Sequence, residues 1–111
     1  MRIQHLTKKE FAETAAKVET IVLPIGTVEP HGDHLPLGTD IFIPERFVDK
    51  IEEKMGEKIM TAPAVNYGHV WTMEPYPGSV SVSTSVLVDY IYEIAFSFIE
   101  NGINNIVLLN G

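Results

Sequence analysis

The chain has 111 residues and a net charge of −7, from 8 Lys plus Arg against 15 Asp plus Glu, and 45% of its residues are hydrophobic. No run approaches the ~20 apolar residues of a membrane span. An acidic chain without a basic cluster argues against nucleic acid as a partner. The absence of cysteine excludes disulfides, cysteine-ligated metals and a thiol nucleophile. We therefore expect a soluble, cytoplasmic globular domain that binds neither membrane nor nucleic acid.

Helix signals alternate with short apolar runs along the chain. Thr7 and Glu10 have the spacing of a capping box at the start of the first helix. Pro44 suits the first turn of the second helix, and Gly56 suits its carboxyl end. The third helix has a wide apolar face and ends at Gly102. The predicted helices span residues 7–17, 44–55 and 85–100, and the predicted strands span residues 20–25, 59–62 and 105–109.

This order of elements predicts the fold class. Apolar strands that alternate with helices are typical of an α/β domain, here a layered α/β/α arrangement with a mainly parallel sheet. No linker or low-complexity segment divides the chain, so residues 1–111 are predicted to form a single domain.

The aperiodic segment 26–40 contains the residues with the clearest chemical potential. Pro30 keeps Glu29 out of the helical region, so Glu29 and His31 lie in an extended segment and project to the same side. Asp40 precedes the predicted second helix and reaches the same point if the glycine-rich segment turns back. One imidazole and two carboxylates suit Zn²⁺, Mn²⁺ or Fe²⁺, among which the sequence does not choose. A loop that leaves the carboxyl end of a parallel strand is also where open α/β sheets bind ligands.

A second interpretation of the same segment needs no metal ion. In it Asp33, His34 and the three candidate ligands are solvated loop residues, and Asp40 caps the helix that follows. The chemistry of the residues alone leaves both interpretations open.

Three segments, in chain order, resemble the creatininase (creatinine amidohydrolase) family. Residues 23–40 read LPIGTVEPHGDHLPLGTD, which is similar to the family's Glu-Gln-His-Gly-Pro-His-Leu-Pro core followed by Thr-Asp. Residues 67–81 resemble its Tyr-Gly…Phe-Pro-Gly-Thr segment. The terminal NIVLLNG resembles the strand that enters an Asn-Gly-His-Gly motif.

The resemblance implies a metal-dependent hydrolase with a layered α/β fold and a two-metal centre. Glu29 would bind one metal ion, His31 would bind the other, and Asp40 would bridge both. The metals would polarise the carbonyl of a small-molecule amide and supply the nucleophile from water, so the reaction would need neither Ser nor Cys. The bond would be a non-peptide C–N bond, in a cyclic amide such as creatinine or in a formamide. The family also suggests a homo-oligomer.

Some positions depart from the family pattern. Pro30 and Asp33 replace Gln and Pro in the core motif, at positions with no assigned metal role. Val70, Thr72 and Met73 stand where many members have Ser, Glu and His. The catalytic and substrate-binding residues therefore stay unassigned.

The resemblance also places the family's next histidine ligand directly after Asn110-Gly111. We therefore expect the chain to be the amino-terminal part of a longer family domain, truncated after the strand 105–109. Three ligands shared by two metal ions leave each ion with about two protein ligands, too few for tight binding. The 111 residues are thus expected to be inactive alone. The alternatives are a non-catalytic truncated subunit for binding or assembly, and half of a site that a second chain completes.

Overall fold

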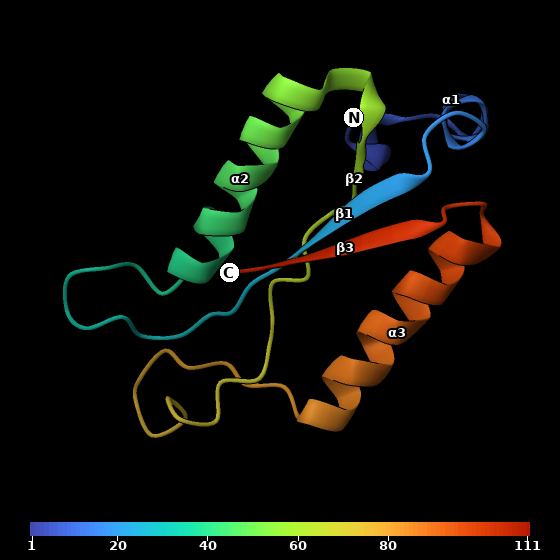
Figure 1. Ribbon diagram of the computed structural model, residues 1–111. Coiled ribbons are helices and arrows are strands. Elements are labelled where there is room, and N and C mark those ends of the chain that lie inside the picture. Colours follow the sequence, from blue (N-terminus) through green and yellow to red (C-terminus); the bar gives the residue numbers. More distant parts are fainter.

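The computed structural model describes all 111 residues and contains a three-stranded parallel sheet with helices on both faces (Figure 1). The strands have the order β2-β1-β3, and both outer strands pair in parallel with β1. The strands are β1 (Thr20–Ile25), β2 (Met60–Thr61) and β3 (Asn105–Asn110). The helices are α1 (Lys8–Ala15), α2 (Thr39–Met55) and α3 (Thr84–Glu100), with 3-10 turns η1 (Ile3–His5) and η2 (Gly56–Lys58). The predicted α/β class and parallel sheet are confirmed.

The side chains of β1 alternate between two apolar layers. Ile21 and Leu23 are fully buried on one face, and Val22 is fully buried on the other, where it meets Val48 of α2. Burying one such side chain contributes about 2 kcal/mol. Figure 1 shows α2 and α3 on opposite sides of the sheet, which gives the layered arrangement. The partly buried side chains of α1 and α3 that pack against the Ile21 layer are Phe11, Ala15, Leu87, Ile91, Ile94 and Phe98.

The capping box at the first helix forms as predicted. The Thr7 hydroxyl accepts a hydrogen bond from the Glu10 amide at 3.3 Å, and the Glu10 carboxylate accepts one from the Thr7 amide at 2.7 Å. The helix nevertheless ends at Ala15, two residues before the predicted Lys17. The second strand is also shorter than predicted, with only Met60 and Thr61 in the sheet.

The predicted start of the second helix at Pro44 is wrong, because α2 begins at Thr39 and Pro44 lies inside it. The extra turn forms because the amides of Ile41 and Phe42 both donate to the carbonyl of Gly38, at 2.9 and 3.0 Å. Proline has no amide hydrogen, so Pro44 cannot donate the helical hydrogen bond to the carbonyl of Asp40, four residues earlier. Asp40 is therefore the second residue of the helix and does not cap it.

The apolar face of the third helix is only partly used by the core. Its inner side packs on the sheet, while Tyr92 and Phe96 are exposed and stack on each other with ring centroids 6.1 Å apart. Beside it, β3 pairs only with β1, and Val107 and Leu108 are 45% and 51% exposed. No helix of the chain is both long enough and apolar enough to cross a membrane.

One partly buried carboxylate joins α2 to the start of the chain and to β2. Arg2 Nε donates to Glu52 Oε2 at 2.9 Å, Thr61 Oγ1 donates to Glu52 Oε1 at 3.1 Å, and the terminal amine of Met1 lies 3.2 Å from Glu52 Oε1. Burial raises the pKa of Glu52, but these hydrogen bonds and the positive amine outweigh it, so the pKa lies below its ordinary value.

We predict that Glu52→Gln lowers the free energy of unfolding by about 1–2 kcal/mol at neutral pH. Because the folded-state pKa of Glu52 lies below the unfolded-state pKa, this stabilisation is present above the unfolded pKa and is lost as pH falls through the folded pKa. Urea unfolding at pH 7 and about pH 3 measures both effects. Glu53→Gln, at an exposed neighbour that pairs only with Lys50, is the matched control. Equal destabilisation by the two variants would contradict the prediction.

Candidate metal centre

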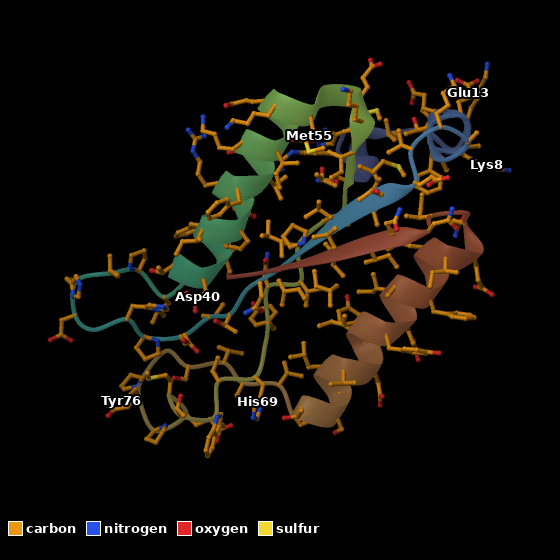
Figure 2. All side chains as sticks on the ribbon, in the orientation of Figure 1. Lys8, Glu13, Asp40, Met55, His69 and Tyr76 are labelled. Carbon is orange, nitrogen blue, oxygen red and sulfur yellow. The ribbon has the colours of Figure 1, made fainter.

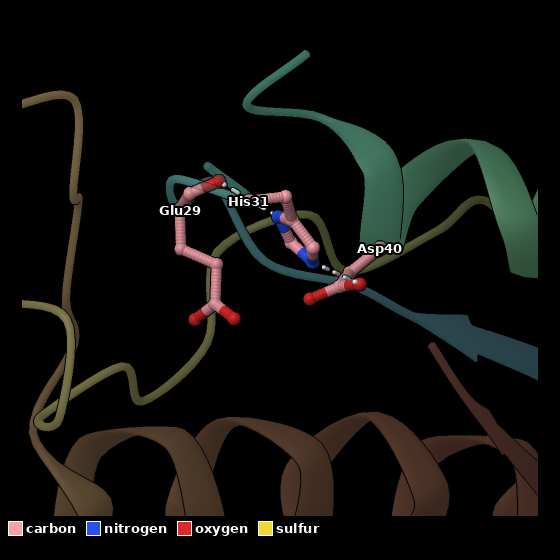
Figure 3. Close-up of side chains that lie close together, drawn as sticks. All are labelled: Glu29, His31 and Asp40. Carbon is pink, nitrogen blue, oxygen red and sulfur yellow. Dashed lines mark hydrogen bonds and ion pairs between the residues drawn. The ribbon is translucent and has the colours of Figure 1, made fainter. Parts of the chain in front are cut away.

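Three potential metal ligands converge at the carboxyl end of β1. One ligand atom from each of Glu29, His31 and Asp40 lies within 4.8 Å of the other two, and all three side chains are partly buried (Figure 3). Glu29 and His31 come from the loop that follows β1, whereas Asp40 comes from the first turn of α2. The structure thus brings together the three residues singled out in the sequence. Their binding of metal stays a prediction.

The loop turns back on itself, which is why Asp40 returns to His31. The Glu29 amide donates to the Leu37 carbonyl at 3.0 Å, and His31 and Leu35 form an isolated antiparallel bridge. Gly32 lies at the turn with φ +71°, a conformation that side chains other than glycine rarely adopt. The two arms of the loop therefore run side by side, and the second arm leads directly into α2.

The close packing of β1 against α2 also needs a glycine. A Cβ atom at Gly26 would lie only 2.5 Å from the Asp40 carbonyl oxygen, so no larger residue fits at the end of β1 without moving the helix. The end of β3 reaches the same place, because the Gly111 amide donates to the Ile25 carbonyl at 2.8 Å. The cluster thus lies where two parallel strands end, as expected for a ligand site in such a sheet.

Hydrogen bonds orient the imidazole of His31. Its Nδ1 lies 3.1 Å from the Glu29 carbonyl oxygen, which only accepts, so Nδ1 carries the proton. Its Nε2 lies 3.0 Å from Asp40 Oδ1 and points into the cluster, where it donates to this carboxylate when protonated and is free to bind a metal ion when deprotonated. The hydrogen bond to the Glu29 carbonyl raises the pKa of His31, and the Asp40 carboxylate adds to the effect. The ring therefore presents Nε2, the nitrogen that a metal ion would use, towards both carboxylates.

The ionised form of Glu29 is disfavoured by its surroundings. Burial raises the pKa of Glu29, and the negative charge of Asp40 raises it further. A divalent cation between them would remove that repulsion. One imidazole and two carboxylates are also a donor set that Zn²⁺, Mn²⁺ and Fe²⁺ accept. Both the charge and the donor types thus fit a metal ion.

Thr27 contacts the candidate site and was not among the residues predicted from the sequence. Its hydroxyl donates to Asp40 Oδ2 at 2.9 Å, so the Asp40 carboxylate is held by Thr27 on one oxygen and by His31 on the other. The available signal was its position two residues before Glu29, since alternate residues of an extended segment share a side. A Cβ at Gly68 would lie 2.5 Å from the Thr27 methyl group, so a second loop packs directly on this residue.

The remaining polar residues of the two loops lie outside the cluster. Residues 26–38, which connect β1 to α2, are called the ligand loop, and Asp33 and His34 are exposed at its outer turn. His69, labelled in Figure 2, uses Nδ1 for a 2.9 Å hydrogen bond to the Val82 carbonyl, and its side chain stays exposed. It therefore joins two backbone segments and contributes nothing to the cluster.

Comparisons with known proteins agree with the fold and point to one family. The family model for Creatininase, described as creatinine amidohydrolase, matches residues 4–111. The chain is 30% identical over 109 residues to the 3-dehydro-scyllo-inosose hydrolase of Thermotoga maritima, covering 97% of this chain and 34% of that protein. It is 28% identical over 115 residues to the creatinine amidohydrolase of Pseudomonas putida, covering 98% and 44%. It is 34% identical over 98 residues to the mycofactocin precursor peptide peptidase of Mycolicibacterium smegmatis, covering 85% and 39%.

A solved structure described as "Creatininase Mn" has the same fold. It superimposes with a TM-score of 0.90 at 25% identity, covering 99% of this chain and 44% of that chain. The chain therefore spans between a third and a half of the length of the proteins that it matches.

We predict that Thr27→Val, which keeps the side-chain shape and removes the hydroxyl, lowers the affinity for Mn²⁺ about tenfold. The reason is that Asp40 loses the donor that orients it. Thr27→Ser, which keeps the hydroxyl, should bind Mn²⁺ within about twofold of the parent chain. Isothermal titration calorimetry measures both affinities, and thermal unfolding checks the fold. Equal affinities for the valine and serine variants would show that the hydroxyl has no such role.

Proposed function

The chain belongs to the creatininase family, and we propose that it contributes the first three ligands of a metal-dependent amidohydrolase centre. The observation that supports this most directly is the placement of Glu29, His31 and Asp40, whose ligand atoms all lie within 4.8 Å of one another. In the two-metal centre that the family resemblance implies, Glu29 would hold one ion, His31 would hold the other, and Asp40 would contact both. The family structure described as "Creatininase Mn" supports a divalent cation, with Mn²⁺, Zn²⁺ and Fe²⁺ as the candidates.

Each side chain has a defined part in the proposed centre. Metal ions held there would supply Lewis-acid polarisation of the amide carbonyl and would make water a nucleophile at neutral pH. His31 presents Nε2 because its Nδ1 proton is committed to the Glu29 carbonyl. Asp40 is oriented by the Thr27 hydroxyl, and its place in the first turn of α2 fixes the carboxylate relative to the sheet. Neither Ser nor Cys is needed as a nucleophile.

The proposed reaction is hydrolysis of a C–N bond in a small amide. The names of the relatives include an amidohydrolase, an inosose hydrolase and a peptidase, so the family's hydrolases act on different substrates. We favour a non-peptide bond, in a cyclic amide or a formamide. A peptide bond is the second candidate, because the mycobacterial peptidase is the relative with 34% identity.

Three ligands for two ions set a limit on what the 111 residues do by themselves. Each ion would keep about two protein ligands, fewer than the three that catalytic zinc sites use. We therefore propose that these residues hydrolyse amides only when further protein ligands join the cluster, from the same polypeptide or from a second one. A non-catalytic binding or assembly role is the alternative. A cytoplasmic location, expected from the composition, remains a proposal. So does a homo-oligomeric state, which the family resemblance suggests.

We predict that Mn²⁺ or Zn²⁺ binds at the cluster of Glu29, His31 and Asp40 with micromolar or weaker affinity. Binding should raise the melting temperature by mass action. Glu29→Gln, His31→Gln and Asp40→Asn should each weaken binding at least about tenfold, because each removes one ligand. Calorimetry and thermal unfolding with added metal measure this. His69→Gln is the matched control, since His69 lies outside the cluster. Metal binding that survives all three ligand substitutions would contradict the proposed centre.

We predict that a chimera containing residues 4–111 in place of the matching part of the Pseudomonas putida enzyme hydrolyses creatinine. The same chimera with Asp40→Asn should lose at least about 100-fold in kcat, because the ligand proposed to bridge both ions is gone. The metal content of each purified chimera separates a folded, inactive protein from a metal-free one. A folded, metal-loaded chimera that is inactive, or an active one that is insensitive to Asp40→Asn, would favour the non-catalytic role.

A further inference from the structure

A cleft of about 600 Å³ opens between the ligand loop and the segment before α3. Pro30 and Gly32, the two neighbours of His31, line it, so it lies beside the proposed metal centre. Figure 2 shows Tyr76 on the loop that faces the ligand loop. One wall consists of Pro30, Gly32, Asp33 and Leu37, and the other of Thr72, Met73, Tyr76 and Pro77.

Backbone contacts hold the two walls in place. The Val80 amide donates to the Val28 carbonyl at 3.0 Å, which ties the second wall to the ligand loop just before Glu29. Within the second wall, the Tyr76 amide donates to the Met73 carbonyl at 2.9 Å. Gly78, with φ +91°, packs its backbone against the Leu37 side chain. Both walls of the cleft are therefore tied to each other by backbone contacts of the fold.

The lining of the cleft contains no cationic side chain. Asp33 is the only charged residue in its lining. All 8 Lys and Arg of the chain lie within residues 2–17 and 46–58, so residues 18–45 and 59–111, which build both walls, contain none. A surface with one sign of fixed charge raises the local concentration of ions of the opposite sign.

We propose that this cleft holds the non-reacting end of the amide substrate and that Asp33 selects a positively charged group there. This inference rests on the proposed function. An ammonium or guanidinium group would pair with the Asp33 carboxylate, and the exposed ring of Tyr76 offers a face to the same cation. The apolar side chains of Leu37 and Met73 would cover the carbon chain that joins this group to the amide. A substrate with a phosphate or carboxylate in the cleft would meet Asp33 and no cationic side chain in the lining.

The test compares two amides of similar shape on the metal-free chain by ¹⁵N NMR titration. N-acetylethylenediamine carries an ammonium group at neutral pH, and N-propylacetamide is its neutral counterpart. We expect the cationic amide to shift the backbone signals of Gly32, Thr72 and Tyr76 and to bind about fivefold more tightly than the neutral one, as suits a partly solvated ion pair. Equal affinities, or shifts that map away from the cleft, would overturn the proposal.

Two controls assign the preference to Asp33. Asp33→Asn should bind both amides equally, whereas Glu74→Gln, which removes a carboxylate from the same region outside the lining, should keep the preference. Raising the salt to 1 M should reduce the preference without any substitution, because exposed charges are screened. A preference that survives Asp33→Asn would overturn the role of Asp33. The metal titration is run separately, so loss of metal binding would count against the proposed function and leave the cleft result unchanged.

Discussion

The arrangement of the site depends on one close contact between β1 and α2. At Gly26 the strand passes so near the first turn of the helix that a Cβ atom would lie 2.5 Å from the Asp40 carbonyl oxygen. This contact sets the height of Asp40 relative to the end of the strand. Thr27, the next residue, is then placed to donate to the Asp40 carboxylate, and Glu29 follows on the same side of the extended chain. A larger side chain at Gly26 would push the helix, and with it one ligand, away from the other two.

Pro44 has a part in the same arrangement. It lacks the amide that would bond to the carbonyl four residues earlier, which is that of Asp40. The region around this carbonyl is crowded, because the backbones of both Gly26 and Gly111 pass close to it. The first turn of α2 is instead fixed from outside the helix, through the Gly38 carbonyl and the hydrogen bond of 2.7 Å from the Thr39 hydroxyl to the Pro36 carbonyl. The hydrogen bonds that fix the first turn of α2 therefore also fix the position of the Asp40 carboxylate in the cluster.

The sequence allowed prediction of those features that depend on local chemistry. β-branched and apolar residues at positions 20–25 indicated the central strand, and Pro30 with the alternation of extended residues indicated that Glu29 and His31 share a side. The start of α2 and the role of Thr27 escaped prediction because both depend on contacts between segments. By sequence Pro44 fits the first turn of a helix. Hydrogen bonds from the next residues to the Gly38 carbonyl, however, add a turn of helix before it. The return of Asp40 depended on whether the glycine-rich segment turns back, which is a matter of contacts between its two arms. The structure places that turn at Gly32.

The outer edge of β3 has a consequence for the behaviour of the chain in solution. Because β3 pairs only with β1, the backbone donors and acceptors along its other side are free of sheet partners, and Val107 and Leu108 flank them half exposed. Such an edge is a template on which any extended polypeptide adds as a further strand. Preparations of these 111 residues are therefore expected to need low concentrations to avoid edge-to-edge aggregation. A lysine in place of Val107 would be the simplest way to keep the protein monodisperse.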